Sequence, residues 1–97
     1  MPSKGFLARL VAKPGKEADL GALLESARAL ALAEEGTVTW YAFQVDAATF
    51  GIFDTFDTED ARQAHINGEI AKALMQAAPD LLAEDPDIRP VDVLAAK

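Results

Sequence analysis

The stretch TVTWYAFQV at residues 37–45, with DAA at 46–48 and TFGIFDTF at 49–56, contains the strongest signal for the predicted fold. Both outer segments are rich in β-branched and aromatic residues, which are typical of strands. The three residues between them leave room only for a turn. The two strands are therefore expected to form an antiparallel hairpin.

A strand and a helix are predicted before this hairpin. Residues 5–13 read as a strand with one fully apolar face, and Pro14-Gly15 ends it. Residues 16–34 form the clearest helix, with Gly36 as its stop signal. Its apolar residues recur at helical spacing and make one stripe, namely Leu20, Leu23, Leu24, Ala27 and Leu30.

A second helix and a last strand are predicted after the hairpin. Asp57 or Thr58 can cap a helix that runs to about residue 78, and the Asn67-Gly68 pair can break it. Residues 79–84 can add one short helical turn. Residues 88–94 form the last strand.

The resulting order βαββαβ is the ferredoxin-like pattern of the α+β class, with a four-stranded antiparallel sheet. The 97 residues suit a single domain over residues 1–97. In this topology the last strand lies at a sheet edge. Pro90 within it supports that placement, because proline is tolerated at edges and not inside a sheet.

Both faces of the predicted sheet carry large apolar groups. Two helices cover one face only, so the other face should be polar in a monomer. An exposed apolar face of this size is unusual for a soluble monomer. We therefore predict a homodimer in which two sheets pack face to face about a two-fold axis. The alternative is that the helix break or the C-terminal tail covers this face.

Composition excludes several classes of function. The net charge of −7 disfavours nucleic acid and anionic membranes as partners. The chain has no cysteine and one histidine, so neither a disulfide nor a metal site is expected. No apolar run reaches the length of a membrane span, and no signal-peptide pattern is present, so a cytoplasmic location is expected.

Two residues stand out as candidates for chemistry. His65 is the single side chain whose ordinary pKa lies near neutrality, and its helical neighbours Ala61, Ala64 and Gly68 are small enough to leave space against the sheet. It could remove a proton from a ligand, or it could be a partly exposed histidine with a local hydrogen bond. Asp54 lies on an apolar strand face, where a buried carboxylate needs a partner. Arg9 could be that partner, or Asp54 could be wet at the strand end.

Aromatic residues of the hairpin are candidates for the walls of a ligand site. Trp40 and Tyr41 point to opposite faces of the sheet, so at most one of them lines a pocket on the helix side. Phe53 follows on the neighbouring strand. Packing in the core or across a dimer interface is the alternative role for these side chains.

Three motifs resemble the antibiotic biosynthesis monooxygenase family, a group of dimeric α/β-barrel proteins. They are Glu35-Gly36-Thr37-Val38-Thr39-Trp40-Tyr41, the stretch from Phe53 to Ala61, and the pair Ala64-His65. The resemblance covers residues 6–94. It implies the dimeric barrel and a small pocket between the sheet and its helices in each subunit.

The resemblance also implies a function. We expect a monooxygenase that acts on a small aromatic or quinol-like compound without any cofactor, with His65 as the catalytic base. Trp40, Tyr41, Phe53 and Asp54 are the expected substrate-binding residues. A dimer that binds small ligands without catalysis, or an enzyme that isomerises or degrades a small carbonyl compound, are the alternatives. The heme-degrading members are a poor match, because the first strand lacks their asparagine, His65 stands where they have a tryptophan, and Met75 lies near the position of their axial histidine.

Overall fold

The computed structural model describes residues 2–97, in which the predicted elements follow one another in the predicted order. They are β1 Lys4–Val11, α1 Glu17–Ala33, β2 Thr37–Gln44, β3 Thr49–Phe56, α2 Glu59–Ile66, α3 Glu69–Leu81 and β4 Asp87–Asp92. The strands pair antiparallel in the order β2-β3-β1-β4. The ferredoxin-like fold and the edge position of β4 are thereby confirmed.

The second predicted helix is divided into two. It breaks at Asn67-Gly68, where the chain leaves α2 and α3 begins. The expected separate turn at 79–84 does not form, because α3 continues through Pro79 to Leu81. Proline removes one backbone donor near the helix end, but the N–H of Leu82 still donates to the carbonyl of Ala78.

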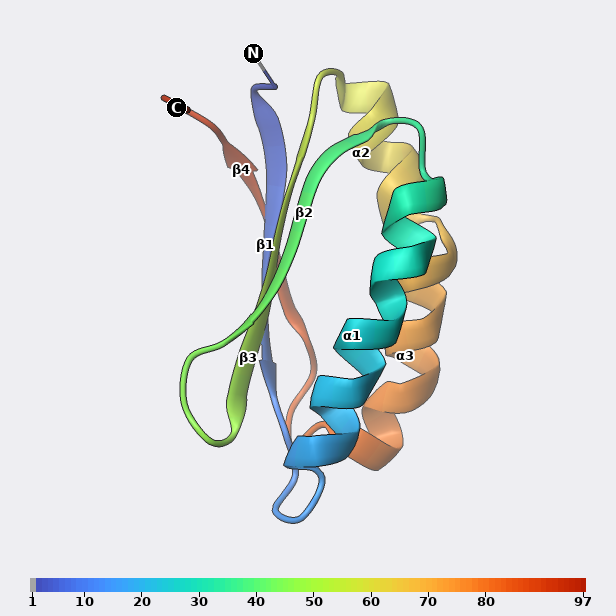
Figure 1. Cartoon of the computed structure of the whole chain (residues 1–97), viewed down its shortest axis with the longest axis vertical. Coiled ribbons are helices and arrows are strands. Elements are labelled where there is room, and N and C mark those ends of the chain that lie inside the picture. The colour runs from blue at the N-terminus through green and yellow to red at the C-terminus, as the bar shows by residue number, and fades with distance from the viewer. Residues whose placement is uncertain (1) are drawn as a thin grey trace.

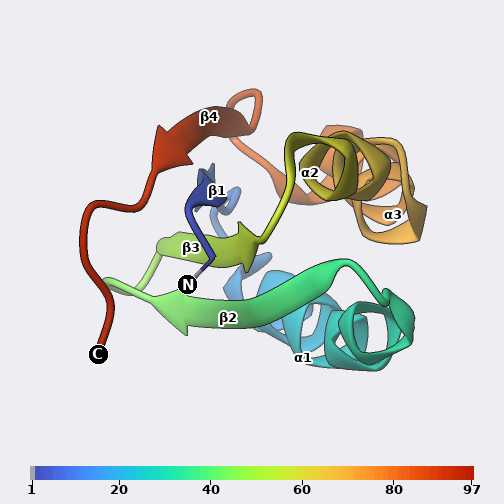
Figure 2. The ribbon, with the colours of Figure 1, turned by 90° about the horizontal axis from the view of Figure 1, so that it is seen from above.

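The three helices lie on one side of the sheet, as the two views show (Figures 1 and 2). The side chains of Phe6, Phe50 and Phe56 point to this covered face and are buried there. Most of the core is aliphatic and lies between the sheet and the helices α1 and α3. The expected apolar stripe of α1 is confirmed for Leu20, Leu24 and Ala27, which are buried, whereas Leu30 at its end is exposed.

The opposite face of the sheet, which we call the open face, has no cover within residues 2–97. Leu7, Tyr41 and Phe43 lie there and are 43%, 58% and 39% exposed. The ring of Phe43 lies over Gly51, where an added Cβ would overlap with it. The predicted apolar character of this second face is present in the structure.

The β2–β3 hairpin is closed by Asp46, whose carboxylate accepts hydrogen bonds from the backbone N–H groups of Ala48 and Thr49. At its other end a bulge between Thr37 and Thr39 shifts the register. Thr37 therefore pairs with Phe56 and lies on the covered face, although Thr39 lies on the open face.

Within residues 2–97, no helix combines the length and apolar character that crossing a bilayer requires.

Candidate functional site

The short helix α2 carries His65 and is held firmly over the sheet. Its first turn is capped by the Thr58 hydroxyl, which accepts a hydrogen bond from the N–H of Ala61. One turn before His65, the Arg62 guanidinium donates to the carbonyls of Gly5 and Val91. It also forms a two-point contact with Glu59 at 2.7 and 2.9 Å. These contacts tie α2 to β1 and β4.

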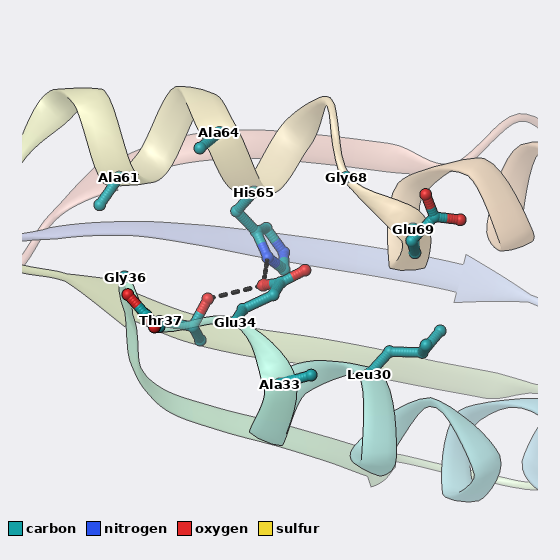
Figure 3. A pocket seen from close by; sticks show the side chains of 11 residues that line it. Leu30, Ala33, Glu34, Gly36, Thr37, Ala61, Ala64, His65, Gly68 and Glu69 are labelled. Carbon is teal, nitrogen blue, oxygen red and sulfur yellow. Dashed lines mark hydrogen bonds and ion pairs between the residues drawn. The ribbon is translucent and has the colours of Figure 1, made fainter.

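His65 bridges two carboxylates that come from distant parts of the chain. Its Nε2 lies 2.9 Å from Oδ2 of Asp54 on β3, and its Nδ1 lies 2.5 Å from Oε1 of Glu34 at the end of α1. The side chain of His65 is only 8% exposed. Figure 3 shows the ring pointing from α2 towards Glu34. The three side chains form a chain of hydrogen bonds, which we call the triad.

The prediction that Arg9 is the partner of Asp54 is wrong. Asp54 pairs across the sheet with Phe6, whereas Arg9 pairs with Gly51 and lies on the open face. Arg9 instead forms an exposed ion pair with Glu84 at 2.9 Å. Asp54 is also not wet, because it is 1% exposed. Because side chains alternate between the faces of a sheet, Arg9 and Asp54 lie on opposite faces. The partner of Asp54 therefore comes from a helix and not from a strand.

Glu34 is the member of the triad that sequence reasoning missed. Its backbone ends α1, and its Oε1 accepts a second hydrogen bond from the Thr37 hydroxyl at 2.7 Å. The loop that carries it lies close to α2, since a Cβ added at Gly36 would come within 2.8 Å of the Cβ of Ala61. A usable signal was present in the sequence. A carboxylate at a helix C-terminus opposes the helix dipole, and no basic residue lies in this last turn to offset it.

An open cavity of about 350 Å³ lies beside the triad, and we call it the outer cavity. Ala61, Ala64 and Gly68 line it together with His65, so the predicted space beside this helix face exists. Its position differs from the prediction, because it lies between the end of α1 and the α2–α3 pair and reaches the sheet only at Thr37 (Figure 3). The polar groups on its walls include Glu34, Glu35 and Glu69.

A second space of about 30 Å³, which we call the inner chamber, lies on the other side of His65 between the sheet and the α2–α3 pair. Its walls are apolar except for His65 and Asp54. The Oδ1 atom of Asp54 is buried and has no hydrogen-bond partner in residues 2–97. A volume of this size matches one water molecule. His65 lines both spaces and separates them.

The environment of His65 acts on its pKa in two directions. Burial disfavours the charged ring and lowers the pKa, but the hydrogen bonds to Asp54 and Glu34 outweigh this and raise the pKa above its ordinary value. The charged ring carries an N–H on each nitrogen, and each can donate to one carboxylate. The geometry of the triad and the direction of the pKa shift therefore agree.

Of the other expected site residues, one lies beside the triad and two lie on the opposite face of the sheet. Trp40 is on the covered face opposite Asp54, partly buried, and its indole N–H has no partner within the described chain. Tyr41 and Phe53 pair with each other on the open face. Neither lines the outer cavity or the inner chamber. Among residues 2–97, no group of three or more His, Asp or Glu side chains is arranged to hold a metal ion.

Several solved structures share the fold of this chain. A putative antibiotic biosynthesis monooxygenase from Nitrosomonas europaea matches with a TM-score of 0.84 and 15% identity, over 95% of this chain and 99% of that one. Another from Caulobacter crescentus matches with a TM-score of 0.82 and 21% identity, over 97% and 92%. The chain has the fold of these proteins, and identities this low show the fold alone.

A more similar structure is that of NE2512, a protein of unknown function from Nitrosomonas europaea. It is 50% identical, with a TM-score of 0.97, and the match covers 100% of this chain and 94% of that one. The chain belongs to the same family as NE2512. No protein-family model matches the sequence, and no curated protein matches it.

Proposed function

We propose that this protein is a monooxygenase that oxidises a small phenol or quinol with dioxygen and needs no cofactor. The observation that carries the proposal is the triad, in which a buried histidine bonds to two carboxylates beside a cavity. A buried histidine with a shifted pKa beside a cavity is a common mark of active sites. The fold shared with putative antibiotic biosynthesis monooxygenases supports the same reaction class.

The proposed reaction needs a proton acceptor more than any other group. Loss of the hydroxyl proton leaves an electron-rich phenolate that dioxygen can oxidise. A phenol and dioxygen together give a quinone and water, so the substrate itself supplies the electrons. One oxygen atom enters the product and the other leaves as water. His65 is the proposed centre of the group that receives the substrate's proton.

The outer cavity is the proposed substrate site. Its volume of about 350 Å³ lies within the range of small-molecule sites, and Leu30 and Ala33 give it apolar walls. Asp54 contributes through its bond to His65. Roles for Trp40, Tyr41 and Phe53 in substrate contact stay predictions.

A homodimer through the open face is part of the proposal. The exposed side chains of Leu7, Tyr41 and Phe43 form an apolar surface on one side of the sheet. A second copy of the same face would cover it and would make the dimeric barrel that the family resemblance implies. The proposed pocket lies on the covered side of the sheet in each subunit.

The function is tested with an oxygen electrode and a panel of phenols and hydroquinones. We expect oxygen uptake with at least one of them. His65→Ala should lower kcat/KM by about 100-fold or more, the usual scale for loss of a proton-accepting group. Gln63→Ala is the matched control, since Gln63 is exposed on the same helix. No uptake with any compound, or equal rates for His65→Ala and wild type, would contradict the proposal.

A further inference from the structure

Neither ring nitrogen of His65 is free to meet a ligand. Nε2 bonds to Asp54 and Nδ1 bonds to Glu34, and the side chain is almost fully buried between them. A substrate hydroxyl could reach a ring nitrogen only if one of these bonds broke. The first atom to receive a substrate proton must therefore lie elsewhere in the triad.

Glu34 presents such an atom to the outer cavity. Its Oε1 accepts hydrogen bonds from His65 and Thr37, whereas its Oε2 accepts none from any residue in 2–97 and is not buried. The side chain as a whole is 21% exposed. In Figure 3 the second oxygen points away from Thr37, towards the side of the cavity where Gly68 and Glu69 lie. A Cβ added at Gly68 would come within 3.2 Å of Oε2, so the glycine leaves this oxygen accessible.

Asp54 does not offer an equivalent position. Its free oxygen Oδ1 is buried and faces the inner chamber, whose volume of about 30 Å³ suits a water molecule and not an aromatic ring. Its other oxygen is taken by His65. Glu34 is thus the single member of the triad with a free acceptor atom on the larger cavity.

We infer that Glu34 is the catalytic residue that contacts the substrate, and that its Oε2 accepts the proton of a hydroxyl group bound in the outer cavity. The inference rests on the proposed function and names the atom that performs its first step. The substrate O–H bond breaks, the proton moves to Oε2, and the electron pair stays on the substrate oxygen. His65 and Thr37 are positioning residues that hold Oε1, and Asp54 holds His65 in turn.

The same arrangement selects the kind of ligand. Glu35 and Glu69 add two further carboxylates to the walls of the outer cavity. An anionic ligand such as a benzoate would be repelled there, whereas a neutral hydroxyl can donate to Glu34. The site therefore fits an uncharged phenol or quinol with an apolar body and at least one free hydroxyl.

The test compares binding of phenol and anisole, which share the ring but differ in the donor hydroxyl. Calorimetry should show that the wild type binds phenol at least about tenfold more tightly, the scale of one hydrogen bond to a charged group. Glu34→Gln should remove most of this preference. Glu25→Gln, the same charge change at an exposed position of α1, should keep it. A small loss of folded protein would lower the apparent affinities for phenol and anisole by the same factor, so their ratio would not change.

Three results would overturn the inference. The preference could survive in Glu34→Gln, neither ligand could bind, or Asp54→Asn could erase the preference while Glu34→Gln keeps it. The last result would place the hydroxyl in the inner chamber. The proposed function fails separately, since phenol can show the Glu34-dependent preference although no compound supports oxygen uptake. Conversely, oxygen uptake that Glu34→Gln leaves unchanged would contradict the inference and spare the monooxygenase.

Discussion

Each face of the sheet departs in one respect from the usual distribution, in which buried side chains are apolar and exposed side chains are polar. The covered face buries a charged group, Asp54, at 1% exposure, although its strand neighbours Ile52 and Phe56 are apolar. The open face exposes the aromatic side chains of Tyr41 and Phe43. Each departure needs compensation, because a buried carboxylate needs a donor and an exposed apolar face needs a cover.

The compensation comes from within the described chain on one face and not on the other. His65 on α2 supplies the donor for Asp54, and Glu34 completes the triad. No helix or strand of residues 2–97 covers the open face. The C-terminal tail runs along that side (Figure 2) but does not pack there, since Leu94 is 92% exposed. A buried carboxylate can thus find a partner within its own chain, whereas the apolar open face is left for the second copy that we propose.

The largest expected effect comes from removing the hydrogen-bond partner of Asp54 on the covered face. His65→Ala would leave Asp54 buried without its donor, which should lower the free energy of unfolding by about 3–5 kcal/mol in urea denaturation. Adding Asp54→Val to this variant should recover part of the loss, because the uncompensated charge is then gone. Gln63→Ala should stay within about 0.5 kcal/mol of wild type. A loss below about 1 kcal/mol for His65→Ala would mean that the triad is not a buried charge cluster in solution.

The next largest effect is expected from placing a charge on the open face, where the proposed dimer forms. Phe43→Asp should raise the dimer dissociation constant at least about 30-fold, the scale for loss of a central aromatic contact of about 2 kcal/mol. Sedimentation equilibrium over a range of concentrations measures it. Leu32→Asp is the matched control, since Leu32 is 68% exposed on α1, on the other side of the sheet. A wild-type protein that sediments as a monomer at micromolar concentration would disprove the dimer.

The smallest expected effect is the pH dependence of stability that His65 causes on the covered face. The pKa of His65 is raised in the folded state, so the folded protein binds this proton more tightly than the unfolded chain does. The resulting stabilisation is fully present below the unfolded pKa of about 6.5 and is lost as the pH rises through the higher folded pKa. The free energy of unfolding of the wild type should fall by about 1 kcal/mol per pH unit in that window. His65→Gln should lack this slope, and a slope of equal size in both proteins would assign it to other groups.

Strand periodicity predicted which side chains share a face of the sheet, but not which side chains of the site bond to each other. The hairpin at 37–56 showed which side chains share a face, and this placed Asp54 among apolar neighbours. The same alternation could have excluded Arg9, since Arg9 falls on the other face of β1. The bulge between Thr37 and Thr39 interrupts this alternation, so parity along the strand misplaces Thr37.

The joining of His65 to its two carboxylates was beyond sequence reasoning for a different reason. Glu34 and His65 are 31 positions apart and lie on separate elements. Their contact depends on the close approach of Gly36 to Ala61 and on the Arg62 contacts that hold α2 over the sheet. Both are properties of packing that no local pattern encodes.

Composition and periodicity were enough for the βαββαβ order, the edge position of β4 and an apolar second face, because these follow from local propensity and alternation along each strand. They also marked His65 and Asp54 as unusual. The tertiary structure alone decided that these two side chains bond to each other, that Glu34 joins them, and that the larger cavity opens between helices. Such contacts join residues distant in sequence, so they depend on the angle and depth at which the helices pack on the sheet.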